Sequence, residues 1–241
     1  MAEQMKKEDL IVLHEDNHVI VVLKPQNVPS CEDESGDKDL LTVIKEHIKE
    51  REGKEGNVYV GLVHRLDRVT GGVMVYAKSS KAAARLSEQM KTGDFEKKYF
   101  AVLNSSPKQK RATLTNYLKK NPINNMVYVC PQTVEGAKFA ELEYRVVEEK
   151  SGLALAEIKL HTGRSHQIRV QMANIGCALY GDMRYGGADA KKGKIALWAT
   201  SLSFTHPVSK ERLCFKIQPP ADEVPWKYFD TSAALGMDVD F

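Results

Sequence analysis

Apolar and polar residues alternate along much of the chain in a way that predicts short strands interrupted by few helices. Apolar runs at residues 10–14 and 18–24 flank the turn-forming pair Asp16 and Asn17, and so predict two neighbouring strands. Between residues 112 and 160 apolar side chains recur at every second position, the period of a strand with one buried face. We therefore expect a mixed sheet with many antiparallel neighbours. Further strands are expected at residues 58–63, 73–78, 97–104, 196–204 and 213–217.

Helical spacing of apolar residues is confined to three segments. Residues 39–52 place leucine and isoleucine at helical intervals and are followed by Gly53, a plausible terminator. The segment 80–91 begins at serines that can cap a helix and ends near Gly93. A third helix is expected to start near residue 166, with Ser165 as its cap, and to end at Gly176.

The bulk composition limits the class of protein. The 241 residues are 42% hydrophobic, enough for an ordinary buried core, and the formal net charge of +3 is too small to attract nucleic acid through the overall field. The four cysteines lack CxxC pairing and indicate neither a zinc site nor a disulfide framework. The N-terminus lacks the apolar core of a signal peptide, and no apolar run approaches the ~20 residues that span a bilayer. We therefore expect a cytoplasmic protein that does not insert into membranes.

The segment GLVHRLDRVTGG, residues 61–72, places one carboxylate among cations in a loop between two predicted strands. Asp67 lies between Arg65 and Arg68 in this loop, where a rigid scaffold can present a side chain to a cleft. Taken alone, such a triplet is more often a solvated aspartate that pairs with its neighbour.

Two further segments favour a functional interpretation of this loop. TGRSHQIR, residues 162–169, is a second cation-rich loop that enters a helix, where backbone amides suit a phosphate. The run Lys97, Lys98 and Tyr99 begins a strand with one aromatic residue beside two cations. The two arginine clusters, the carboxylate and the tyrosine are therefore expected to converge on one cleft.

These motifs resemble those of the RluA-like pseudouridine synthases, enzymes that isomerise uridine in RNA. HRLDRVTGG is similar to the signature HRLDxxTSG of that family, and KPQNVPS is similar to its KPxGxPV segment. TGRSHQIRVQM and GCALYGDMRYGG resemble its TGRxHQIRxH and GDxxYG blocks. The motifs follow one another in the same order over roughly residues 10–218, and such long ordered matches are far more specific than one short pattern.

The resemblance implies roles for individual residues. Asp67 matches the catalytic aspartate of the family, and Tyr99 matches the active-site tyrosine that stacks on the target base. Arg169 matches the basic residue that pairs with the aspartate, and Arg65 matches the arginine that fills the space left by the flipped nucleotide. Further RNA contacts are expected from Arg68, His64, Arg164 and Lys98, although a histidine beside an apolar run is more often a structural hydrogen-bonding residue.

The fold that the resemblance implies is α+β, with a mixed, mostly antiparallel sheet, flanking helices and a central catalytic cleft. We expect one catalytic domain over residues 1–241, with its core at about residues 10–228 and no separate N-terminal RNA-binding domain. The expected partner is ribosomal or transfer RNA. No metal and no cofactor are expected, and the protein is expected to be a monomer.

The chain departs from the family pattern at several positions. Gly71 stands where serine is usual, which adds freedom to the loop behind Asp67 and puts the rigidity of this loop in doubt. Gln26 and Asn27 replace the usual small residues after the Lys-Pro pair. Cys31 and Gln171 each occupy a position where histidine is common. None of these changes removes a catalytic role.

Two alternative functions can be weighed against the enzyme. HRLD is similar to the kinase HRD loop, but the chain has no DFG motif and no glycine-rich nucleotide loop, so a protein kinase is excluded. A noncatalytic RNA-binding module or a ribosome assembly factor would use the same surfaces without turnover. The presence of Asp67, Tyr99 and Arg169 together favours an active enzyme over this second alternative.

Overall fold

The computed structural model describes residues 5–53 and 55–236, and its internal contacts divide the chain into two compact units. Unit 1 comprises the described residues up to Glu96 together with Ser201–Ile217. Unit 2 comprises Lys97–Thr200 and the described residues from Gln218 onward. The outer parts of the two expected tails, residues 1–4 and 237–241, lie outside the described residues, and the single catalytic domain stays a prediction.

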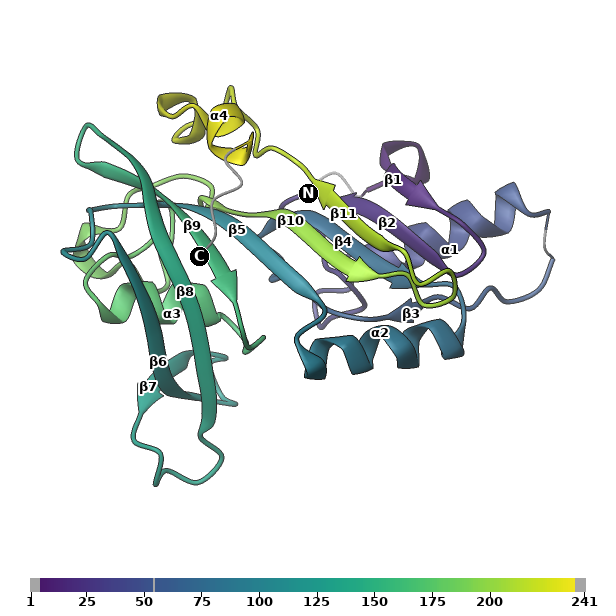
Figure 1. Ribbon diagram of the computed structural model, residues 1–241, viewed down its shortest axis with the longest axis horizontal. Coiled ribbons are helices and arrows are strands. Elements are labelled where there is room, and N and C mark those ends of the chain that lie inside the picture. The colour runs from purple at the N-terminus through teal and green to yellow at the C-terminus, as the bar shows by residue number, and fades with distance from the viewer. Residues whose placement is uncertain (1–4, 54, 237–241) are drawn as a thin grey trace. The chain divides into compact units, whose positions relative to one another are not determined.

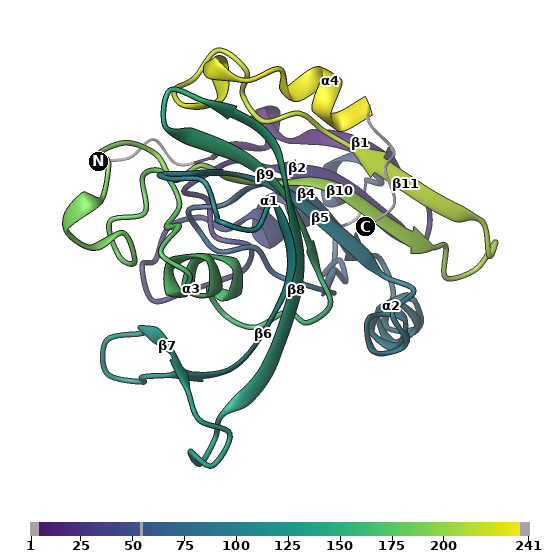
Figure 2. The same ribbon diagram turned by 60° about the vertical axis from the view of Figure 1, so that its left-hand side comes forward.

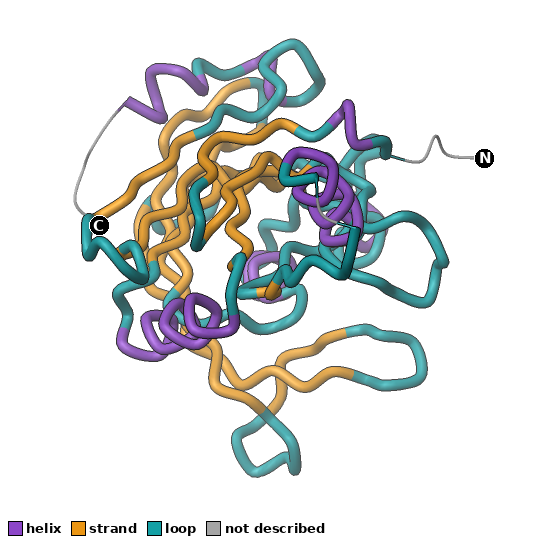
Figure 3. The backbone as a smooth tube through the Cα atoms, turned by 90° about the vertical axis from the view of Figure 1, so that its right-hand side faces the viewer, coloured by secondary structure: helices purple, strands orange, loops and turns teal. Residues whose placement is uncertain are grey.

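Among the described residues, strands outnumber helices in both units (Figures 1 and 3). The strand pairs of known register are antiparallel, so the expected α+β class with a mostly antiparallel sheet is confirmed. The strands are β1 (Ile11–Glu15), β2 (Val19–Lys24), β3 (Gly61–Leu62), β4 (Gly71–Ala77), β5 (Glu96–Leu103), β6 (Arg111–Lys120), β7 (Val127–Cys130), β8 (Lys138–Lys150), β9 (Leu153–Leu160), β10 (Leu197–Thr205) and β11 (Arg212–Lys216). The helices are α1 (Leu40–Arg51), α2 (Ser80–Thr92), α3 (Gln167–Asn174) and α4 (Thr231–Gly236).

In unit 1, β2 pairs with β1 on one edge and with β4 on the other. β10 follows β4 in the strand order, and β11 pairs with the Ser201–Thr205 part of β10. The helix α2 forms where the sequence predicts it, because the Ser79 hydroxyl accepts the Ala82 amide at 3.2 Å and Gly93 ends the helix at φ +87°.

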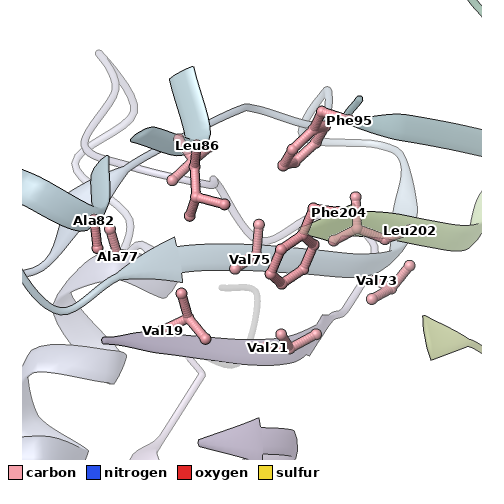
Figure 4. Close-up of a cluster of buried hydrophobic side chains, with 11 residues drawn as sticks. Val19, Val21, Val73, Val75, Ala77, Ala82, Leu86, Phe95, Leu202 and Phe204 are labelled. Atoms are coloured by element: carbon pink, nitrogen blue, oxygen red, sulfur yellow. The ribbon is translucent and has the colours of Figure 1, made fainter. Parts of the chain in front are cut away.

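A cluster of buried side chains holds α2 against this sheet (Figure 4). Val73 and Val75 of β4 and Leu86 of α2 belong to this cluster, and the rings of Phe95 and Phe204 stack with their centroids 5.9 Å apart. Every residue of β4 is buried. The strand that leaves the Asp67 loop is therefore anchored in the core of unit 1.

The strand expected at residues 58–63 is much shorter in the structure. Only Gly61 and Leu62 pair, opposite Ala77 and Tyr76 at the end of β4. The edges of β4 are taken by β2 and β10, so β3 finds a partner only at this end. Burial of Val60 and Val63 accounts for the apolar pattern without a continuous strand.

In unit 2 the strands follow the order β5, β9, β8, β6 and β7. The helix α3 contacts β6 and β7, and in Figure 2 it lies against the curved ribbon of these strands. Val170 of α3 packs on Leu118, Val127 and Ala140. The expected cap at Ser165 is wrong, because His166 is the N-cap residue and its side chain makes no capping hydrogen bond.

Candidate active site

The loop that carries Asp67 runs between β3 and β4 in unit 1 and ends in a tight turn. The Thr70 amide donates to the Asp67 carbonyl oxygen at 2.9 Å, which closes a β-turn over Arg68 and Val69. Asp67 is partly buried, whereas Thr70 is buried. The carboxylate therefore stands at a fixed turn next to a buried strand.

The ammonium group of Lys24 lies beneath this turn. Lys24 is fully buried, and its Nζ donates to the carbonyl oxygens of Pro25 at 2.9 Å, Arg68 at 3.0 Å and Thr70 at 2.7 Å. Three carbonyl acceptors match the three N–H groups of a lysine ammonium. Burial lowers the pKa of Lys24 to about 7, while the charge of Asp67 acts to raise it.

The residues after Lys24 hold the rest of the loop. The Asn27 amide donates to the Arg68 carbonyl at 2.8 Å, and the Gln26 side-chain amide donates to the Val69 carbonyl at 2.9 Å. The Ser30 hydroxyl donates to the Leu66 carbonyl at 2.9 Å. KPQNVPS is therefore a clamp on the Asp67 loop, which explains why a proline-rich segment accompanies the HRLD motif.

Gly71 was expected to add freedom to the Asp67 loop, but the hydrogen bonds of this clamp hold the loop in place. Gly71 is buried and is the first residue of β4, where its strand neighbour Gly72 pairs with Lys24. The loop carbonyls are held by side chains of the 24–30 segment, so no hydroxyl is needed at residue 71. Sequence reasoning assigned no role to Lys24, although a lysine that ends an otherwise apolar strand directly before proline was a signal.

The basic residues around Asp67 fall into different environments. Arg68 donates to Asp37 and to the Ser35 hydroxyl, and Asp33 lies 3.8 Å from its guanidinium, so carboxylates already compensate its charge. His64 is buried, and its Nε2 accepts the Val75 amide at 3.2 Å, which favours its structural role over contact with RNA. Arg65 is exposed.

Arg169 lies in unit 2 and is held by a carboxylate of the same unit. Its Nε and Nη2 donate to the two oxygens of Asp182 at 2.8 Å each, and both side chains are buried. Asp182 also accepts the amides of Arg184 and Tyr185. This fork geometry fixes the plane of the guanidinium, so the GDxxYG block orients the basic residue of TGRSHQIR.

Tyr185 extends this arrangement toward the start of α3. The Arg169 guanidinium lies over its ring, 5.1 Å from the centroid, and its hydroxyl accepts the Val127 amide at 2.9 Å. The same hydroxyl lies 2.7 Å from Nδ1 of His166, which has the left-handed backbone angle φ +51°. Since the Tyr185 hydroxyl accepts from Val127, it can donate its proton to a neutral Nδ1.

The side chain of Gln167 replaces the expected serine cap. Its Oε1 accepts the Arg164 amide at 2.9 Å and the Thr162 hydroxyl at 2.8 Å. Deeper in α3, the Gln171 side-chain amide donates to the Leu114 carbonyl at 3.0 Å and to Asn116 Oδ1 at 2.8 Å. Gln171 therefore ties α3 to β6.

The other predicted site residues of unit 2 lie on β5 and in the loop before α3. Tyr99 is buried on β5 and pairs with Ile158 of β9. Lys98 is partly buried, and Arg164 is exposed, with its Nε donating to the Phe139 carbonyl at 2.7 Å. Asp67 belongs to unit 1, and Tyr99 and Arg169 to unit 2, so the expected convergence of these three residues stays a prediction.

The described residues contain no group of three or more histidine, cysteine, aspartate or glutamate side chains placed to hold a metal ion. Within residues 5–53 and 55–236, no helix has both the length and the apolar character needed to cross a bilayer.

Comparison with known proteins identifies the family. The family model for RNA pseudouridylate synthase matches residues 18–174. YhcT and YjbO of Bacillus subtilis, both named as uncharacterized RNA pseudouridine synthases, are 30% and 34% identical to the chain. The YhcT match covers 89% of this chain and 70% of the relative, and the YjbO match covers 88% and 74%.

A third relative and a solved structure agree with this result. The ribosomal large subunit pseudouridine synthase D of Zymomonas mobilis is 30% identical, over 88% of this chain and 70% of its own. Human RNA Pseudouridylate Synthase Domain Containing 4 has the same fold, with a TM-score of 0.73 at 22% identity, over 87% of this chain and 88% of that one. The chain belongs to the RNA pseudouridylate synthase family.

Proposed function

We propose that this enzyme converts specific uridines of ribosomal or transfer RNA to pseudouridine, with Asp67 as the catalytic carboxylate. The observation that supports this role most strongly is the clamp on the Asp67 loop, in which Lys24, Gln26 and Ser30 hold the loop carbonyls. A nucleophile that must attack and leave in one geometry needs such a rigid mount. The family membership supplies the reaction class.

The reaction breaks the bond from ribose carbon 1 to uracil nitrogen 1 and joins the same ribose carbon to uracil carbon 5. Carbon 5 loses a proton and nitrogen 1 gains one, so the reaction is balanced without an oxidant or an energy source. A carboxylate can form a covalent bond and leave again. Asp67 can serve the reaction by covalent attack at uracil carbon 6, by covalent attack at the ribose, or by helping to form a glycal-like intermediate without a covalent bond to the carboxylate.

Arg169 and Tyr99 complete the proposed catalytic set. The bidentate pair with Asp182 neutralises one side of the Arg169 guanidinium and leaves Nη1 outside that pair. A nearby guanidinium favours the charged form of a carboxylate, and the sequence match assigns this role toward Asp67. Tyr99 is assigned to the face of the uracil ring and to removal of the carbon 5 proton.

RNA recognition is assigned to the exposed cations near these residues. Arg164 and Arg65 are exposed, whereas Arg68 is compensated by Asp33 and Asp37. We therefore rank Arg65 and Arg164 above Arg68 as phosphate or base contacts, with Lys98 as a further contact. We propose that the enzyme acts as a monomer in the cytoplasm, where ribosomal and transfer RNA are available.

The proposed function is tested by incubating the purified protein with total RNA from cells that lack it. We expect new pseudouridines at specific positions, formed without ATP or any redox cofactor. Mapping of pseudouridine in cells with and without the protein identifies the natural RNA. Wild-type protein that binds RNA but forms no pseudouridine on any cellular RNA would favour the noncatalytic alternative.

Substitution of Arg65 tests how the target uridine is extruded. Extrusion of a stacked uridine costs roughly a few kcal/mol, and a side chain that fills the vacated space offsets part of this cost. We expect Arg65→Ala to lower activity about tenfold on a structured RNA, which corresponds to about 1.4 kcal/mol, and to lower it less on a flexible single strand. Lys81→Ala, which removes an exposed cation of α2, is the matched control. An equal loss on both RNAs would argue against this role.

A further inference from the structure

Lys97 differs from the other lysines that the structure removes from water. Lys24 donates to three carbonyl oxygens, and Lys78 binds Glu15 at 2.7 Å and Glu52 at 3.2 Å. Lys97 is partly buried at the start of β5, and among the described residues its ammonium group has no hydrogen-bond or ion-pair partner. A desolvated cation without a partner is costly unless it serves a ligand.

The Lys97 ammonium lies against the loop that leads into α3. A side-chain carbon added at Gly163 would lie 3.4 Å from Lys97 Nζ, so the nitrogen is close to the backbone of the TGR motif. This proximity follows from the sheet, because β5 and β9 are antiparallel and β9 ends just before the loop. Lys97 therefore lies under the same loop that carries Arg164.

This loop offers donors to a ligand in solvent. Gly163, Arg164 and Ser165 are exposed, and neither the Gly163 nor the Ser165 amide has an acceptor among the described residues. Gln167 fixes the loop by accepting the Arg164 amide. The backbone amides, the Ser165 hydroxyl and Arg164 of this loop, together with Lys97 of β5, form a site suited to a phosphate group.

The electrostatics of Lys97 agree with such a site. Burial lowers the pKa of Lys97, and no carboxylate of the described residues counteracts this effect. An anion that enters the site would supply the missing negative charge and raise the pKa of Lys97 again. A ligand, rather than a contact within the fold, therefore accounts for the charge of the Lys97 ammonium, which no carboxylate of the described residues balances.

We propose that Lys97 and the Gly163–Ser165 loop hold one phosphodiester of the substrate RNA. This inference rests on the proposed function and assigns a subsite to it. Lys97 and Tyr99 are two residues apart on β5 and so point to the same face, with Cα atoms about 7 Å apart. The phosphodiester held by Lys97 is therefore one adjacent to the nucleotide whose base meets Tyr99.

The salt dependence of RNA binding tests this proposal. Binding of a short fluorescent oligouridine is measured at several KCl concentrations for the wild type and for Lys97→Gln. Each phosphate contact on a single strand contributes about 0.7 to the slope of log K against log salt. We expect the magnitude of the slope to fall by about 0.7 in Lys97→Gln and to stay at the wild-type value in Lys97→Arg.

Two further variants separate this contact from general effects. Lys91→Gln removes an exposed cation of α2 that pairs with Glu88, and it should leave the slope unchanged. Lys97→Met should lose the same 0.7 while its Tm stays equal to or above that of the wild type, because a desolvated charge is removed. A Tm that falls in Lys97→Met would instead make Lys97 a structural residue and overturn the proposal.

Other outcomes would also overturn it. A wild-type slope in both Lys97→Gln and Lys97→Met excludes a phosphate contact. Loss of pseudouridine formation with an unchanged slope would place Lys97 in the chemical step. The binding assay requires no turnover, so it remains decisive for the subsite even if wild-type protein forms no pseudouridine, the result that would defeat the proposed function.

Discussion

Asp67→Asn abolishes pseudouridine formation, with an expected loss of ~10⁴-fold or more, while RNA binding stays close to that of the wild type. Asparagine keeps the shape of the side chain, but it lacks the negative charge and the nucleophilic oxygen that the reaction needs. Losses of this size are typical when the nucleophile of a covalent mechanism is removed. Initial rates of pseudouridine formation and equilibrium binding to the same RNA measure the two effects.

The structure indicates that this variant keeps its fold. The turn at Asp67 is closed through its backbone carbonyl and the Thr70 amide, so it does not depend on the carboxylate. Asp33→Asn is the matched control, because Asp33 is an exposed carboxylate near Arg68 whose removal should leave the rate within a few-fold of wild type. Substantial turnover by Asp67→Asn would refute the role of Asp67.

Lys24→Met removes the group that holds the loop, and we expect it to lower both stability and activity. Carbonyl oxygens of Pro25, Arg68 and Thr70 lose their buried donor. A buried acceptor left without a partner costs about 1–3 kcal/mol, and the Arg68 carbonyl keeps the Asn27 amide, so the total loss should be about 3 kcal/mol. Displacement of the nucleophile by about 1 Å can cost ~10²-fold in rate.

The two effects are measured separately, by urea unfolding and by initial rates under conditions where the variant remains folded. Lys78→Met is the control, because it removes a second lysine of unit 1 whose side chain is only 7% exposed and whose partners are glutamates rather than the loop carbonyls. We expect Lys78→Met to lower stability without a comparable loss of rate. A Lys24→Met protein as stable and active as the wild type would show that the clamp does not position Asp67.

The elements of the fold that local patterns govern were predictable from the sequence. Ser79 and Gly93 mark the ends of α2, and the alternation on β8 marks its buried face. The strand predicted over residues 58–63 was too long, because residues that are buried without strand pairing give the same apolar pattern as a strand. The cap of α3 was misassigned because a glutamine side chain, rather than the serine, accepts the loop amide.

The contacts that shape the site depend on residues far apart in the chain, which a local pattern does not reveal. Lys24 reaches Thr70 across 46 positions, and its place at the end of an apolar strand does not reveal which carbonyl oxygens its buried ammonium group meets. Arg169 was matched to the partner of Asp67, whereas its bidentate pair with Asp182 depends on how the chain returns after α3. The motifs supplied the candidates for the reacting groups, but the side chains that hold these candidates in place emerged only from the fold.

The glutamine at residue 171 has a consequence for the conditions under which the enzyme can work. Its amide anchors α3 to β6 through the Leu114 carbonyl and Asn116, and it never gains or loses a proton. An imidazole at this buried position would change charge near neutrality. The attachment of the helix that bears Arg169 is therefore independent of proton concentration, whereas an imidazole anchor would gain a charge as the solution becomes more acidic.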